Sequence, residues 1–239
     1  MNLIPMHGNL APRRFGRMGL WLSLLSGLLW TGGTFCPAVA EDSPSKRWEP
    51  DIRKFEESDK TNPPPQGAVL FIGSSGIKRW NTLKEDFPEC TVINRGFGGS
   101  HIVDSVHYAD RIVIPYKPRL IVFRAGINDL HSGRTPEQVL GDFDAFVKKV
   151  RDKLPETRIA FLSINPSLKY WNCIEQERKA NELVKAYVAA GTNLDFVDIS
   201  TAMLGADGKP RPELYVADGL HCTAEGYKLW TSLVRPHLK

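Results

Sequence analysis

Five short apolar runs separated by helical patterns constrain the fold of this chain more than any other feature of its sequence. Continuous apolar runs of about four to eight residues are typical of strands buried on both faces of a parallel sheet. The runs occupy residues 68–72, 91–94, 120–123, 159–164 and 194–198. The helical patterns occupy residues 136–154, 174–190 and 223–233. This alternation predicts an α/β fold, a three-layer α/β/α sandwich with a flavodoxin-like parallel sheet of about five strands.

The first forty residues have the three parts of a secretory signal peptide. Three arginines precede an apolar run over residues 18–30, and the segment ends in Ala-Val-Ala at positions 38–40. We therefore predict a signal peptide over residues 1–40, cleavage after Ala40 and export to the periplasm or the medium. An uncleaved membrane anchor is the alternative, although the run is shorter than the ~20 residues that span a bilayer.

The distribution of charge excludes a nucleic-acid partner. The net charge is +4, and residues 1–40 carry three of these positive charges, so the rest of the chain is close to neutral. A near-neutral chain without a basic run lacks the electrostatic footprint of a nucleic-acid-binding protein. We predict a polar lead-in with a Pro-rich linker over residues 41–66 and one domain over residues 67–239. After cleavage no stable membrane anchor is expected, and the oligomeric state stays open.

An exported domain would retain three cysteines, Cys90, Cys173 and Cys222. An odd number leaves at least one thiol free or paired with another chain. A Cys173–Cys222 disulfide is one possibility, and three small buried side chains are the favoured alternative. The spacing of the cysteines does not match a zinc site.

Polar residues follow the predicted strands, at the edge where open α/β sheets bind ligands. Ser75 follows the first strand, Gly99 the second and Asn128 the third, and Asp218 stands three residues before His221. Each has a structural interpretation by itself, such as an N-cap serine, a turn-forming asparagine or a packed histidine. Together they supply a nucleophile, a backbone donor, a side-chain donor and an oriented base. These are the parts of acyl transfer through a tetrahedral oxyanion.

One glycine run suggests a different class of protein. Gly96 and Gly98 begin a dinucleotide-binding fingerprint, which would favour a flavodoxin-like nucleotide-binding protein. The third glycine position is His101 instead, and the run follows the second strand rather than the first. Both departures disfavour nucleotide binding.

Four short sequence blocks resemble the SGNH hydrolases, also called GDSL-type esterases and lipases. The blocks lie at residues 71–75, 94–100, 126–129 and 218–221, and the resemblance covers residues 67–235. Ser74 stands where the family usually has Asp. The resulting Gly-Ser-Ser block in a compact domain resembles the small platelet-activating-factor acetylhydrolase-like members. The α/β-hydrolase elbow G-x-S-x-G does not fit, because position 77 is Ile.

The resemblance implies a serine esterase that hydrolyses carboxylic esters through an acyl-serine intermediate. Ser75, Asp218 and His221 would be the catalytic residues, and Gly99 and Asn128 would form the oxyanion hole. No metal and no organic cofactor is expected. The implied substrate is a small-molecule or glycan ester with a short acyl or acetyl group. The alternatives are a lysophospholipase or thioesterase acting on lipids, and a non-catalytic glycan-binding module on the same fold.

Several bulky side chains near the strand ends are candidates to line the site: Trp80, Arg95, Arg124, Tyr170 and Trp171. For Trp80 we favour core packing. The segment 169–171 is the better candidate for a loop that contacts substrate. Whether Asp129 and Arg95 tune the site or hold the loops stays open.

Overall fold

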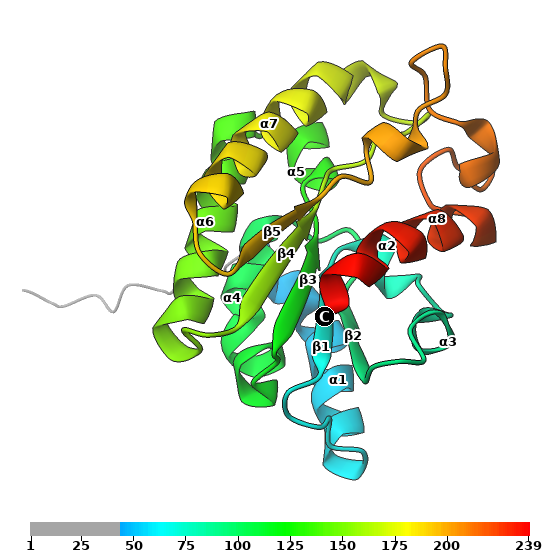
Figure 1. Ribbon diagram of the computed structural model, residues 1–239. Helices are drawn as coiled ribbons and strands as arrows, with labels where there is room; N and C mark the ends of the chain where they lie inside the picture. Colours follow the sequence, from blue (N-terminus) through cyan, green and yellow to red (C-terminus); the bar gives the residue numbers. More distant parts are fainter. Residues whose placement is uncertain (1–43) are drawn as a thin grey trace, which may run out of the picture. The chain divides into compact units, whose positions relative to one another are not determined.

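Five parallel strands form a single sheet in the order β2-β1-β3-β4-β5 (Figure 1). The computed structural model describes residues 44–239. The strands are β1 (Val69–Gly73), β2 (Val92–Gly96), β3 (Leu120–Arg124), β4 (Arg158–Leu162) and β5 (Leu194–Val197). All five predicted strands are confirmed, with ends that differ by at most two residues. The strand order is that of flavodoxin-like folds, as the sequence predicted.

Helices cover both faces of the sheet (Figure 1). One face carries α1 (Glu49–Thr61), α4 (Ile102–Ile112), α5 (Ile127–His131), α6 (Pro136–Lys153) and α7 (Ile174–Ala190). The other carries α2 (Ser75–Lys78), α3 (Leu83–Asp86) and α8 (Ala224–Val234). The three long helices predicted from the sequence are confirmed as α6, α7 and α8.

The central strand β1 shows how the apolar runs produce this architecture. Successive side chains of a strand point to opposite faces of the sheet. Leu70 and Ile72 pack into the core beneath α4 and α6, whereas Val69 and Phe71 pack into the core beneath α8. All four side chains are fully buried. A strand with both faces buried needs a continuous apolar run, and helices on both faces complete the predicted three-layer sandwich.

The segment expected to be a lead-in is folded onto the domain. Residues 44–48 form a 3-10 helix and α1 follows directly, so most of the 41–66 segment is helical. Ile52 is fully buried, and Trp48 packs edge-on against Phe97 with 6.0 Å between ring centroids. Arg111 of α4 forms ion pairs with Glu49 of α1 at 2.7 Å. The apolar face of α1 thus packs against the helices that cover the sheet. The segment is part of the domain and is not a linker.

The N-terminal predictions lie largely outside the described residues. The proposed signal peptide over residues 1–40 and cleavage after Ala40 both fall there. Among the helices of residues 44–239, none combines the length and the apolar character needed to cross a bilayer. Cys90, Cys173 and Cys222 are all free thiols and partly buried, so the possible Cys173–Cys222 disulfide is absent.

Candidate active site

Ser75, His221 and Asp218 form a continuous hydrogen-bonded chain. Ser75 is the first residue of α2, just beyond the carboxyl end of β1. Its Oγ lies 2.9 Å from His221 Nε2, although the two residues are 146 positions apart. On the other side of the ring, Nδ1 lies 2.6 Å from Asp218 Oδ2. A hydroxyl, an imidazole and a carboxylate in this order have the geometry of a serine nucleophile with an oriented base.

The loop that carries Asp218 and His221 is held by its own backbone. Asp218 Oδ1 accepts hydrogen bonds from the N–H groups of Leu220 and His221, both at 2.9 Å. Gly219 turns the chain with a φ of +66° and donates to the Val216 carbonyl at 2.9 Å. A side chain is disfavoured at such a φ. A tight turn within the D-x-x-H segment therefore brings the Asp218 carboxylate to the His221 ring.

The same contacts keep the Asp218 carboxyl ionised. Burial by itself would raise the pKa of Asp218, but hydrogen bonds from the backbone and ring of His221 and from Leu220 lower this pKa well below its ordinary value. An ionised carboxylate accepts a hydrogen bond from Nδ1–H, so the ring proton stays on Nδ1. Nε2 then carries no proton and faces the Ser75 hydroxyl. The tautomer required of a general base follows from this arrangement.

Backbone donors lie beside the serine. Gly99 adopts a φ of +76°, and a Cβ at this position would lie 3.1 Å from Cη2 of the Trp48 ring. Within residues 44–239, the backbone N–H groups of Ser75 and Gly99 have no hydrogen-bond partner. Free N–H groups next to a nucleophile can stabilise negative charge on a bound carbonyl oxygen.

The amide nitrogen of Asn128 already donates two hydrogen bonds within the protein. Its Nδ2 donates to Ser74 Oγ at 2.7 Å and to the Ser100 carbonyl at 3.0 Å. Ser74, which stands at the usual Asp position of the family, is completely buried. The Gly-Ser-Ser block thus serves two purposes: one hydroxyl fixes the Asn128 amide, and the next faces His221.

A cavity of about 500 Å³ opens over these groups. It is lined by Ser75, Lys78, Arg79, Asn81, Gly98, Gly99, Asn128, Leu220 and His221. Four of the five catalytic and oxyanion-hole residues predicted from the sequence line this cavity. The fifth, Asp218, lies outside the lining and hydrogen-bonds His221. Lys78 and Arg79 were missed by the sequence analysis, although Lys78 is the last residue of α2 and Arg79 follows it directly.

Other candidates from the sequence lie elsewhere. Trp80 is 1% exposed and belongs to the core, as favoured. Arg95 pairs with Asp59 of α1, and Arg124 is buried behind α2, so neither lines the cavity. Asp129 Oδ1 accepts from the Ile102 N–H at 3.0 Å, so this carboxyl ties α5 to the start of α4.

The 169–171 segment also lies outside this cavity. The Tyr170 ring stacks on His131 with 3.8 Å between centroids. The Lys169 N–H donates to the Gly219 carbonyl at 3.0 Å, which buttresses the turn between Asp218 and His221. The segment therefore supports the histidine loop in this structure instead of lining the cavity.

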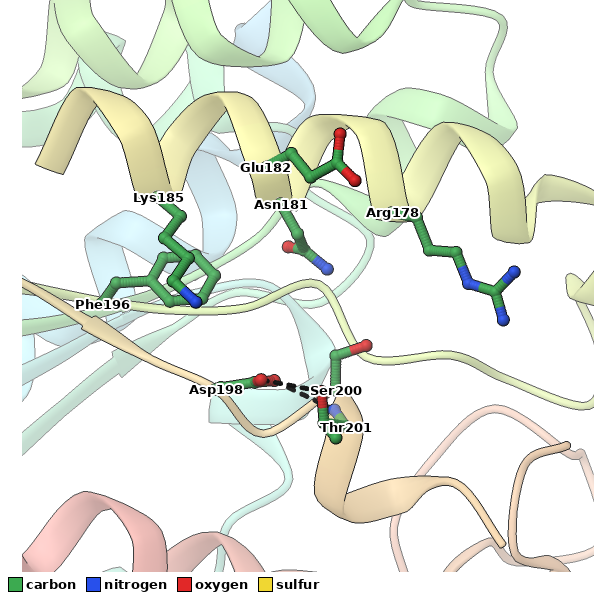
Figure 2. A pocket seen from close by; sticks show the side chains of 8 residues that line it. All are labelled: Arg178, Asn181, Glu182, Lys185, Phe196, Asp198, Ser200 and Thr201. Atoms are coloured by element: carbon green, nitrogen blue, oxygen red, sulfur yellow. Dashed lines mark hydrogen bonds between the residues drawn. The ribbon is translucent and has the colours of Figure 1, made fainter. Parts of the chain in front are cut away.

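A smaller cavity of about 210 Å³ lies between α7 and the end of β5 (Figure 2). The Lys185 ammonium lies 6.0 Å from the centroid of the Phe196 ring, and the Asp198 carboxylate is bonded within its own turn to Thr201. None of the residues singled out from the sequence lines this cavity. The predicted catalytic and oxyanion-hole residues therefore belong to the 500 Å³ cavity and not to this one.

Comparison with known proteins agrees with this geometry. The sequence profile of the GDSL-like Lipase/Acylhydrolase family matches residues 72–229, more than half of the chain. The chain belongs to the GDSL-like lipase/acylhydrolase family. The predicted resemblance is thereby confirmed, and the four sequence blocks all lie within or directly beside the matched region. This GDSL-family protein is accordingly an esterase-like acylhydrolase.

The GDSL-family domain is similar to several named proteins and solved structures. The human platelet-activating factor acetylhydrolase IB subunit alpha1 is 29% identical over 189 residues, which cover 76% of this chain and 78% of the relative. A Streptococcus pneumonia structure provisionally described as a platelet activating factor has a TM-score of 0.72 at 22% identity, covering 81% of this chain and 94% of that one. A carbohydrate esterase family 3 structure from Talaromyces cellulolyticus has a TM-score of 0.59 at 18% identity, covering 71% and 95%. The two structures show that the fold is shared.

Proposed function

We propose that this protein is a serine esterase that hydrolyses short-chain carboxylic esters through an acyl-serine intermediate. The Ser75–His221–Asp218 chain carries the proposal, because its distances of 2.9 and 2.6 Å connect a cavity-facing hydroxyl to an anchored carboxylate. The three side chains come from two distant parts of the sequence. A purely structural N-cap serine does not require a histidine and an aspartate aligned behind it.

The mechanism follows from these contacts. His221 Nε2 takes the Ser75 proton as Oγ attacks the ester carbonyl carbon, and Asp218 stabilises the imidazolium that forms. The oxyanion receives hydrogen bonds from the N–H groups of Ser75 and Gly99. Asn128 contributes an amide N–H that it shares with Ser74 or Ser100. His221 then protonates the leaving alcohol, and water attacks the acyl-serine with His221 again as base.

The lining of the cavity supports a small acyl group and a polar alcohol. Among the nine lining residues, Leu220 alone has a purely apolar side chain. A long acyl chain would need a larger apolar surface than this to offset its desolvation. Two relatives act, by their names, on an acetyl ester and on carbohydrate. We therefore propose acetyl or other short acyl esters, on carbohydrate in particular, as substrates.

A lipid substrate is the second candidate, and one observation favours it. The acetylhydrolase relatives are named for platelet-activating factor, which is a lipid, and they cover 76% of this chain. A lysophospholipase or thioesterase would then use the same serine. The two candidates differ in the acyl chain and alcohol that they accept, so a substrate series separates them.

The decisive test compares the wild type with Ser75→Ala on p-nitrophenyl esters from acetyl to decanoyl. We expect activity that falls with chain length and is lost in the variant. Activity that rises with chain length would instead support the lipid candidate. Full activity in Ser75→Ala would refute the serine mechanism. No activity on any ester, together with no labelling of Ser75 by a fluorophosphonate, would instead favour a non-catalytic glycan-binding module.

Export remains a separate proposal that rests on residues 1–40. The basic start, short apolar run and Ala-Val-Ala ending support it. The N-terminal sequence of the mature protein, recovered outside the cytoplasm, should begin at Glu41. A full-length chain retained in the cytoplasm would contradict it.

A further inference from the structure

Arg124 places a guanidinium inside the protein, directly behind the proposed nucleophile. It is the last residue of β3 and only 4% exposed. Its carbonyl accepts a hydrogen bond from the Ser74 N–H at 3.1 Å. Its side chain donates from Nη2 to Asn165 Oδ1. Backbone and side chain of one residue thus connect the turn before Ser75 to the segment that follows β4.

The guanidinium packs against the first turn of α2. A Cβ on Gly76 would lie 3.0 Å from Arg124 Nη1 and 3.1 Å from Cη2 of Trp230. Arg124 also lies over the Trp230 ring, with Cζ 5.4 Å from the ring centroid. The glycine that follows Ser75 is therefore needed because a guanidinium and an indole occupy the space that a side chain would fill.

This positive charge has no direct counter-ion. Within residues 44–239 Arg124 forms no ion pair, and its Nε is buried without a hydrogen-bond partner. The opposing buried carboxyl is Glu177 of α7, which is 1% exposed and has no hydrogen-bond partner on either oxygen. Burial raises the pKa of Glu177 to about 8, with the charge of Arg124 acting in the opposite direction. Glu177 is thus largely neutral at pH 7. Burial also lowers the pKa of Arg124, but an arginine stays protonated in proteins because its ordinary pKa is so high.

A buried charge without a counter-ion is costly. Its position behind a backbone that carries free N–H groups suggests what it contributes. We propose that Arg124 is a positioning residue for Ser75: it fixes the first turn of α2 and adds positive potential behind the N–H groups that face the oxyanion.

The physical basis is the low dielectric of the interior. A fixed positive charge packed against Gly76, the residue after Ser75, acts with little screening there. It favours the negative charge that develops when Oγ attacks, and it needs no reorganisation during the reaction. The uncharged ester gains less from the same potential, so the effect should fall on kcat rather than on KM.

The inference rests on the proposed esterase function, so its test begins with the wild type and Ser75→Ala on p-nitrophenyl acetate. Arg124→Met then removes the charge at similar length, and Arg124→Lys keeps the charge without the planar fork. Arg119→Met is the matched control, since Arg119 is an exposed arginine at the opposite end of the same strand. Each variant is measured for kcat, KM and Tm.

For the folded Arg124→Met variant we expect kcat to fall about tenfold, with KM within about threefold of wild type. This loss is smaller than the ~10²–10³-fold cost of a direct oxyanion donor. Arg124→Lys should retain more of kcat than Arg124→Met, and Arg119→Met should match the wild type. A merely structural arginine would instead lower Tm and leave the kcat of the folded variant unchanged.

Wild-type kcat in a folded Arg124→Met variant would overturn the inference while leaving the esterase proposal intact. Equal activity of wild type and Ser75→Ala would remove the esterase proposal itself, and the inference with it. If Arg124→Met does not fold, Arg124→Gln provides the same test, because it removes the charge and keeps a hydrogen-bond donor. Wild-type kcat in that variant would equally overturn the role of the charge.

Discussion

The Asn128 amide donates a 2.7 Å hydrogen bond to the buried hydroxyl of Ser74, the residue directly before the proposed nucleophile. This contact links the first and third sequence blocks of the family beneath the cavity floor. The contact also indicates a role for Ser74, which replaces the usual Asp. Its hydroxyl accepts a hydrogen bond from Asn128 and so orients this oxyanion donor.

Ser74→Ala should therefore reduce kcat by about fivefold, because it removes one hydrogen bond worth ~1 kcal/mol while the Ser100 carbonyl still holds the amide. Steady-state kinetics on p-nitrophenyl acetate would measure this. Ser105→Ala is the control: that serine is fully buried on α4 and its hydroxyl has no partner. Equal kcat in both variants would show that Ser74 does not orient Asn128.

Asp218→Asn should lower kcat by about 10³–10⁴-fold without unfolding the loop. Asn can still accept the backbone N–H bonds of Leu220 and His221 through its oxygen, but its NH₂ cannot accept the ring proton. The histidine would then expose a protonated Nε2 to Ser75 and lose its function as a base. Asp207→Asn, in an exposed turn, serves as the matched control. A loss below about tenfold would mean that Asp218 does not set the tautomer.

Gly99→Ala should lower kcat, whereas Gly133→Ala should not. Both glycines have positive φ, at +76° and +92°, so both alanines carry the same ~1–2 kcal/mol backbone cost. Only at position 99 would the new Cβ meet a neighbour, Trp48 at 3.1 Å, while at 133 nothing lies within 4 Å. The contact should displace the Gly99 N–H and reduce kcat about tenfold or more. Similar kcat in the two variants, at similar Tm, would argue against an oxyanion role for Gly99.

Glu177 should make stability fall as pH rises from about 5 to about 8. The pKa of Glu177 is raised by burial from 4.5 to about 8, so in this window the folded protein binds a proton that the unfolded chain has released. Stability then decreases with pH, by at most ~1.4 kcal/mol per pH unit. Above about pH 8 both states have lost the proton and the effect levels off.

Thermal melts at pH 5, 6, 7 and 8 would measure this slope in wild type and in Glu177→Gln. The amide cannot ionise, so the variant should lose that part of the slope. Glu175→Gln changes an exposed glutamate of the same helix and should keep the wild-type slope. Parallel slopes in wild type and Glu177→Gln would show that Glu177 is ionised in the folded protein across this range.

Much of the fold was predictable, because the information is local. A strand buried on both faces requires an unbroken apolar run, and Leu70 and Phe71 illustrate why: one packs under α4 and α6, the other under α8. The packing of the N-terminal segment was harder to predict, since the residues around Trp48 and Ile52 give no local sign of the surface they dock on. That site depends on Phe97 and α4, which are remote in the sequence.

The order of strands and helices along the chain and the residues at the strand ends follow from short-range sequence patterns. Tertiary packing brings Ser75 and His221, 146 residues apart, to 2.9 Å and places Arg124 behind the serine instead of in the cavity. Side-chain direction at a strand end is set by the packing of the whole sheet against both helical layers. No local pattern gives that direction, and the direction decides whether a residue lines the cavity or packs behind it.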